Sequence, residues 1–245
     1  MKAFTAWMLV SMLLVSMVVG VRLLLVARRT RGLPELLFGL GFLGGGIGQA
    51  FGALGARLLW TTPGPLATPL NTAFFFIVVV ATGCLFAAVW QVFCSQDRRG
   101  VVTFFVGTGA ALVAYGMRFH AGDFGSGAVD SLGNMLFTVT RVSLFIWAAV
   151  EAFHSYGILR KRVRLELASP VATNQILLWG LAAVFSAAMT LVIGHNTITL
   201  HRSPLEDPLS MALLLLFVIL ASVSMWCSFF PPAALRRRLE ARAHA

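Results

Sequence analysis

Seven long apolar runs, joined by short polar turns, occupy most of this sequence. About 20 residues of α-helix are needed to cross the hydrocarbon core of a bilayer, and the runs approach or exceed that length. Only 11% of the residues are charged, whereas a soluble domain has roughly 25%. The sequence therefore predicts an all-α integral membrane protein with seven transmembrane helices, over about residues 4–27, 34–59, 69–93, 101–119, 131–159, 170–194 and 208–230.

The predicted bundle covers residues 1–232 as one domain, and a basic tail, 233–245, follows it. Lys2 and the first apolar run together resemble a signal peptide, but the run is too long and no small-residue cleavage site follows it. We therefore expect the first helix to be retained. The arginine-rich tail has the composition of a short amphipathic helix on the membrane surface.

Basic residues gather in every second turn. Thirteen of the 19 lysines and arginines fall in these turns and in the tail. Cytoplasmic loops carry such an excess, so the pattern predicts an outside N-terminus and a cytoplasmic C-terminus in a bacterial cytoplasmic (inner) membrane. The formal net charge of +10 would suggest nucleic acid in a soluble protein. Here topology accounts for it, so membrane lipids, including anionic lipids at the cytoplasmic face, are the expected partners and nucleic acid is not.

The first three and the last three predicted helices have the same orientation. Each set contains a basic turn that ends in a helix-starting proline, at 28–34 and at 160–170. This pattern permits a parallel repeat of three helices with a single linking helix between the two copies.

Five glycines follow one face of the second predicted helix. Their spacings of four, three, four and three residues keep them on one side of an α-helix: Gly41, Gly45, Gly48, Gly52 and Gly55. In lipid, a stripe without side chains lets neighbouring helices approach closely. The stripe predicts close helix packing, and the alternative is that it admits a flat ligand or a lipid tail.

Arg141 lies about ten residues into the fifth predicted helix, too deep for easy contact with the headgroups. A charge at that depth costs on the order of 3 kcal/mol, so it is expected to face the bundle interior and find partners. Asn134 and Thr138 share its face, and Gln49 and Tyr115 are the nearest polar residues by depth. These five residues are the predicted site for an anionic group. The alternative is a structural arginine held by helix carbonyls, Gln49 and water.

Glu151 and His154, three residues apart, share a face near the inner end of the same helix. Glu-x-x-His is a di-metal pattern only when it occurs on two helices with further carboxylates, and here it occurs once. A proton relay and a local hydrogen-bonded pair are the two remaining interpretations. The spacing of His120, Asp123, His195 and His201 does not require a metal site, and no cofactor is predicted.

Seven helices, an outside N-terminus, short loops and a basic tail resemble the seven-helix opsins, receptors and sugar transporters in topology. Residues 97–99, Asp-Arg-Arg, are similar to the acidic-arginine motif of G-protein-coupled receptors. Opsins hold retinal on a lysine of the seventh helix, and residues 211–230 contain none. A covalent retinal Schiff base is therefore excluded.

The function predicted from these features is that of a receptor-like or accessory protein. It would bind a small molecule or lipid in an outward-facing pocket between helices two, three and five to seven, and it is not expected to be an enzyme. The alternative is a small-solute transporter that uses Arg141 for an anionic substrate and Glu151 with His154 for proton coupling. A homo-oligomer is a further expectation.

Overall fold

The computed structural model describes residues 2–60, 67–126, 131–200 and 207–233. Within these ranges the chain is helical and contains no β-strand. The long helices are α1 (Lys2–Thr30), α2 (Leu33–Trp60), α3 (Ala67–Phe93), α4 (Arg98–His120), α6 (Leu132–Val163), α7 (Pro170–Gly194) and α8 (Pro208–Phe229). The short α5 (Asp123–Ser126) follows α4, and the π-helical η1 (His195–Thr199) extends α7.

Side-chain caps begin four of the long helices where the sequence changes from polar to apolar. Asp97, Ser131, Ser169 and Asp207 each accept a backbone N–H of the first turn. Capping satisfies an amide that has no partner within its own helix. Pro170 and Pro208, at the start of α7 and α8, add a fixed φ angle that suits this position.

Five helices in the described residues are long and apolar enough to cross a membrane: α3, α4, α6, α7 with η1, and α8. Large apolar side chains also cover the outside of the bundle. On α4, for example, Phe105 and Val106 are each 65% exposed. A water-soluble protein rarely exposes so much contiguous apolar surface, so the fold is consistent with a multi-pass α-helical membrane protein.

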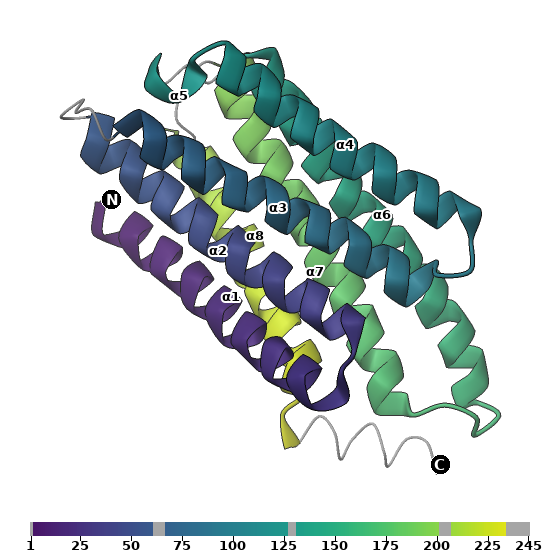
Figure 1. Ribbon diagram of the computed structural model, residues 1–245. Coiled ribbons are helices and arrows are strands. Elements are labelled where there is room, and N and C mark those ends of the chain that lie inside the picture. Colours follow the sequence, from purple (N-terminus) through teal and green to yellow (C-terminus); the bar gives the residue numbers. More distant parts are fainter. Residues whose placement is uncertain (1, 61–66, 127–130, 201–206, 234–245) are drawn as a thin grey trace.

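Six of the helices form a closed ring. Consecutive helices pack on each other along the chain, and contacts of α3 with α6 and of α1 with α8 complete the circle. In Figure 1, α1, α2, α3 and α4 form the near layer, and α6, α7 and α8 lie behind them. Helix α4 packs on α3 and α6 from outside the ring. The interior of the ring is thus bounded by α1, α2, α3, α6, α7 and α8.

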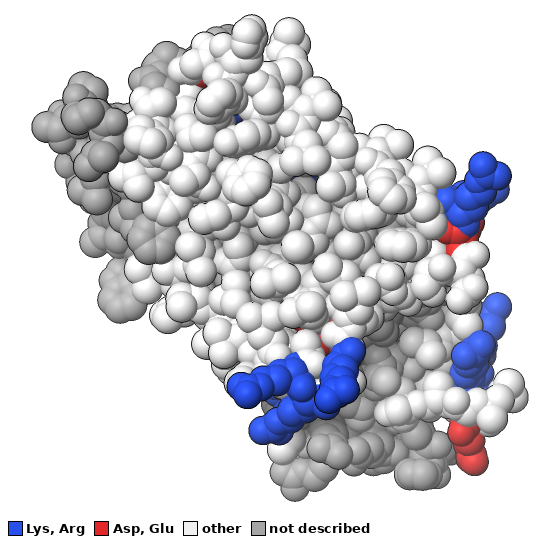
Figure 2. All heavy atoms as spheres, in the orientation of Figure 1, with Lys and Arg blue, Asp and Glu red and all other residues white. Residues whose placement is uncertain are grey.

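The basic turns meet at one end of the bundle. Figure 2 shows the blue side chains gathered at the end where α1 joins α2, α3 joins α4 and α6 joins α7, with an almost uncharged flank above them. These turns contain Arg28 to Arg31, Arg98 with Arg99, and Arg160 to Arg164. We call this the basic end. The first residues of α1 lie at the opposite end (Figure 1).

Bare backbone on α2 lets it pack against both of its neighbours. A Cβ atom added to Gly41 would lie 2.6 Å from the side chain of Leu85 in α3, and one added to Gly48 would overlap Val78 in α3. On the other side, a Cβ at Gly46 would lie 2.5 Å from Ser16 in α1. Close approach of helices through small residues is the expected means of packing in lipid.

Gly45 differs from Gly41 and Gly48 of the same stripe. Among the described residues, no side chain and no backbone of another helix lies within 4 Å of the position its Cβ would take. Gly52 and Gly55 belong to the part of α2 whose surroundings lie outside the described residues.

A buried amide joins the end of α7 to the start of α8. Asn196 is 1% exposed, and its Nδ2 donates to the Val192 carbonyl at 3.0 Å and to Ser210 Oγ at 2.9 Å. We expect Asn196→Ala to lower the free energy of unfolding by about 1–3 kcal/mol, the cost of leaving a buried polar partner unpaired. Thermal unfolding in detergent measures this loss.

Thr197→Ala is the matched control, because among the described residues the Thr197 hydroxyl bonds to carbonyls of its own helical segment, those of Ile193 and Gly194. Its expected loss is well below that of Asn196→Ala. Equal losses for the two variants would show that the Asn196–Ser210 bond does not join the helices in the way described.

Candidate functional site

A cavity of about 120 Å³ lies inside the ring of six helices, and each of the six contributes to its wall. Arg141 of α6 and three serines, Ser16 of α1, Ser186 of α7 and Ser222 of α8, form the polar part of the lining. The rest of the wall is apolar or bare backbone and includes Gly45. The open space next to Gly45 is therefore this cavity.

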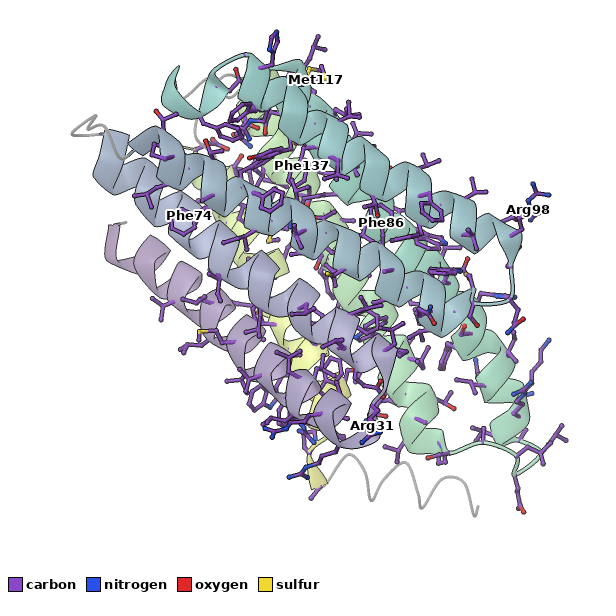
Figure 3. The ribbon with its side chains drawn as sticks, in the orientation of Figure 1. Arg31, Phe74, Phe86, Arg98, Met117 and Phe137 are labelled. Atoms are coloured by element: carbon purple, nitrogen blue, oxygen red, sulfur yellow. The ribbon has the colours of Figure 1, made fainter. Side chains whose placement is uncertain are left out.

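The guanidinium of Arg141 lies between two aromatic rings of its own helix. Its Cζ is 5.9 Å from the ring centroid of Phe137 and 5.8 Å from that of Phe145. A cation within about 6 Å of a ring face is attracted by the ring quadrupole. Figure 3 shows Phe137 among the side chains in the bundle interior, whereas Arg31 and Arg98 extend from the basic end. Arg141 itself lines the central cavity and does not belong to the basic turns.

Among the described residues, the lining of this cavity includes no aspartate or glutamate and no second cation. A single positive charge in an apolar cavity is the arrangement that favours an anionic group. Taking such a charge out of water costs several kcal/mol, and a bound anion offsets this cost.

Two further hollows lie between the central cavity and the basic end. The next hollow, of about 60 Å³, shares Phe42, Leu85 and Phe145 with the central cavity. Beyond it lies a space of about 360 Å³ that includes Arg22 and reaches the end of the bundle. These hollows form an interrupted path from the basic end to Arg141.

An aromatic pair stands between the second and third hollows. Phe38 of α2 and Trp179 of α7 line both of them. Their ring centroids are 4.3 Å apart and the rings are nearly perpendicular, at 89°. The Trp179 indole nitrogen is buried and has no hydrogen-bond partner among the described atoms. This pair lies where the two hollows adjoin.

Three of the residues predicted to join Arg141, namely Asn134, Thr138 and Tyr115, are not among the described residues that line its cavity. Thr138 Oγ1 donates to the Asn134 carbonyl at 2.9 Å, and the methyl group of Thr138 packs against Gly194 of α7. Neither Asn134 nor Thr138 lines the cavities described here. Thr138 therefore faces α7 and not the cavity. The Gln49 side chain lies outside the described residues.

Tyr115 belongs to a separate aromatic cluster at the end opposite the basic one. It stacks on Phe75 of α3 at 6.3 Å and lies 5.9 Å from Phe124 of α5. Arg118 joins this cluster, with its Cζ 4.4 Å from the Phe75 ring centroid and its Nε 3.9 Å from Asp123 Oδ2. The sequence interpretation missed the Arg118–Asp123 pair. A cation and an acid that lie five residues apart, on either side of a helix end, could have indicated it.

Glu151 and His154 also lie apart. Trp147 Nε1 donates to Glu151 Oε1 at 3.2 Å, whereas the His154 side chain is exposed on the outside of the bundle. Cys94, just past the end of α3, lies against Glu151. Burial of the Cys94 thiol, together with its hydrogen bond to Glu151 and the negative charges of Glu151 and Asp97, raises its pKa to about 12.

Glu151 thus joins α6 to the end of α3, and it lines none of the cavities described here. At 1.5 Å per residue it is about 15 Å along α6 from Arg141. The geometry does not connect it with the central cavity as a proton relay.

The histidines and the aspartate that the sequence suggested as metal ligands do not form a cluster in the described residues. No group of three His, Cys, Asp or Glu side chains there is placed to hold a metal ion. His120 and His195 are exposed, Asp123 pairs with Arg118, and His201 lies outside the described ranges.

Comparison with protein families, with curated proteins and with solved structures finds no match to this chain. The central cavity around Arg141 is therefore the feature of this chain that bears most directly on its function.

Proposed function

We propose that this protein is a small-solute transporter of a bacterial cytoplasmic membrane, with seven spans, that binds an anionic solute at Arg141. The observation that carries the proposal is the position of Arg141, which lines a cavity to which all six ring helices contribute. Intramembrane charges commonly mark the pathway of a substrate or an ion.

The arrangement of the ring supports a repeat. Helices α1, α2 and α3 follow each other in contact, as do α6, α7 and α8, and the third helix of each set contacts the first of the other. Two such sets related by an axis along the membrane normal are one known plan of transporters, which bind substrate where the repeats meet. The cavity around Arg141 lies between the two sets of three helices, and α4 corresponds to the linking helix.

Orientation follows from the positive-inside rule. The basic end would face the cytoplasm, with the N-terminus outside. The interrupted hollows would then lead from Arg141 to the cytoplasm, which differs from the outward-facing pocket expected from the sequence. Arg22, with its Cζ 4.0 Å from the Phe230 ring centroid at this end, is well placed to contact anionic lipid headgroups.

A receptor-like or accessory binding protein is the second candidate. The contact between Phe38 and Trp179 favours this alternative, because it interrupts the row of hollows between Arg141 and the basic end. The adjoining hollow of about 60 Å³ is also small. A binding protein needs access to its cavity from one side only. A transporter needs access from each side in turn.

Thiol accessibility distinguishes the two candidates. In a variant without Cys84, Cys94 and Cys227, Ser222→Cys places a thiol in the cavity wall. We expect a membrane-impermeant anionic methanethiosulfonate to modify it from both sides, in right-side-out and in inside-out vesicles. The readout is the loss of later labelling by a fluorescent maleimide.

Val223→Cys is the matched control, because Val223 is the next residue of α8 and is 55% exposed on the outside of the bundle. Its thiol is expected to face lipid and to react from neither side. Modification of Ser222→Cys from one side only would overturn transport in favour of the receptor-like candidate. A rate no higher than that of Val223→Cys would overturn both.

A further inference from the structure

The charge of the cavity wall selects a monoanion. Among the described residues that line the cavity, Arg141 is the one cation and none is a carboxylate. A zwitterion would bring into this largely apolar cavity an ammonium group for which the described lining offers no counter-charge, and burying such a charge is unfavourable. A dianion would likewise bury a second negative charge that the wall does not balance.

The polar groups of the wall suit a carboxylate. A guanidinium presents a planar fork of N–H donors that matches the two oxygens of a carboxylate. Serine hydroxyls are both donors and acceptors, and Ser16, Ser186 and Ser222 reach the cavity from three different helices. Ser186 Oγ donates its proton to the Ala182 carbonyl at 2.8 Å, so this proton is not available to a ligand. Ser16 and Ser222 can turn their O–H groups toward the cavity and donate to a carboxylate.

The remainder of the wall suits a short alkyl chain. Val15, Val19, Val218, Met189 and Met225 contribute to it. Apolar surface of this kind stabilises each bound methylene group by removing it from water, and methionine adapts its shape to a ligand. A sugar or polyol would leave most of its hydroxyl groups unpaired here, which disfavours it.

The volume limits the length of that chain. A cavity of about 150 Å³ holds benzene, with six heavy atoms. The central cavity has about 120 Å³, and the adjoining hollow adds about 60 Å³. Together these spaces fit a ligand of roughly five to eight heavy atoms by the same comparison.

We infer that the ligand of the central cavity is a short-chain monocarboxylate of roughly three to five carbons. The inference rests on the proposed function, since it names the chemical class of the anion bound at Arg141. The carboxylate would contact Arg141 and the hydroxyl groups of Ser16 and Ser222, and the alkyl chain would lie against the valines and methionines.

Four compounds with four-carbon chains test the class on the purified wild-type protein at neutral pH. Butyrate, succinate, γ-aminobutyrate and 1-butanol differ in charge but hardly in length. We expect butyrate to compete with radiolabelled butyrate at least tenfold better than each of the other three. In the monocarboxylate series, affinity is expected to peak between propionate and pentanoate and to fall at least tenfold by octanoate.

The outcomes separate this inference from the proposed function. Tight, saturable binding of succinate or γ-aminobutyrate, at least equal to that of butyrate, would overturn the monocarboxylate class and leave an anion site at Arg141 standing. Equal binding of butanol and butyrate would show an apolar site and overturn both. Absence of butyrate binding, together with labelling of Ser222→Cys from both sides, would overturn the class alone.

Discussion

Arg141→Met will weaken butyrate binding about 100-fold or more while leaving the bundle as stable as before or slightly more stable. Removing one partner of a buried, hydrogen-bonded charge pair costs about 3–5 kcal/mol, and 1.4 kcal/mol is a factor of ten in affinity. In the free protein the substitution removes contacts of Arg141, such as those with Phe137 and Phe145, but it also removes a charge that costs on the order of 3 kcal/mol at the membrane centre. Methionine has a similar length and fills the same space.

This pair of effects distinguishes the two interpretations of Arg141. If the arginine were a structural residue, its replacement would lower stability and any effect on binding would follow from unfolding. If it holds an anion, binding is lost and stability is kept. Equilibrium binding of radiolabelled butyrate and thermal unfolding of the same samples give both numbers.

Arg118→Met is the control, because the opposite pattern is expected for it. Arg118 pairs with Asp123, which is 5% exposed, and lies over Phe75. The substitution leaves the Asp123 carboxylate buried without its cation and loosens α5 from α3 and α4. We expect stability to fall by several kcal/mol and butyrate affinity to stay within about threefold in the protein that remains folded. If Arg141→Met and Arg118→Met changed butyrate affinity and stability in the same way, Arg141 could not be called a binding residue and Arg118 a structural one.

The helical content could be predicted from the sequence because it depends on local properties. Long apolar runs, Ser and Asp caps and helix-starting prolines are each visible in the chain, and the described helices begin and end within a few residues of the predicted bounds. The basic turns likewise indicated one end of the bundle, since the net charge of a turn does not depend on packing.

The composition of the cavity could not be predicted, because it depends on how each helix is rotated about its axis. In water, the apolar face of a helix identifies the side that is buried. In lipid, both the interior and the exterior are apolar, so the sequence pattern does not fix the rotation. Thr138 therefore packs against Gly194 although it shares a predicted face with Arg141, while Ser16, Ser186 and Ser222 reach the cavity from helices that carried no signal.

Gly45 and Gly48 lie on the same predicted stripe, yet substitutions there are expected to have opposite consequences. Gly45→Leu places a side chain where no side chain or neighbouring helix of the described part of the chain lies within 4 Å of the new Cβ, in the cavity next to Arg141. A leucine side chain is about as large as the alkyl chain of butyrate, so it fills the space that the ligand would take. We expect butyrate affinity to fall at least 100-fold and stability to rise by a few tenths of a kcal/mol up to about 1, because glycine is a poor helix former.

Gly48→Leu will instead disrupt the fold. Its Cβ would overlap Val78 and lie 3.1 Å from the Phe74 carbonyl oxygen of α3. Backbone cannot move aside as a flexible side chain can, and overpacking of this kind costs about 1–3 kcal/mol. The expected result is a lower unfolding temperature, with butyrate affinity retained in the folded fraction. Gly48→Ala, a smaller change with the same Cβ, gives the same direction where the leucine variant is not produced.

The comparison of these two glycines tests the ligand site and the helix packing independently. Gly45→Ala adds only a methyl group to the cavity and is expected to keep most of the affinity, which makes the loss in Gly45→Leu an effect of volume. If Gly45→Leu bound butyrate like the wild type, the cavity would not be the site of binding, whatever Arg141→Met had shown. If Gly48→Leu were as stable as the wild type, α2 and α3 could not meet through bare backbone, and the ring that encloses the cavity would be assembled differently.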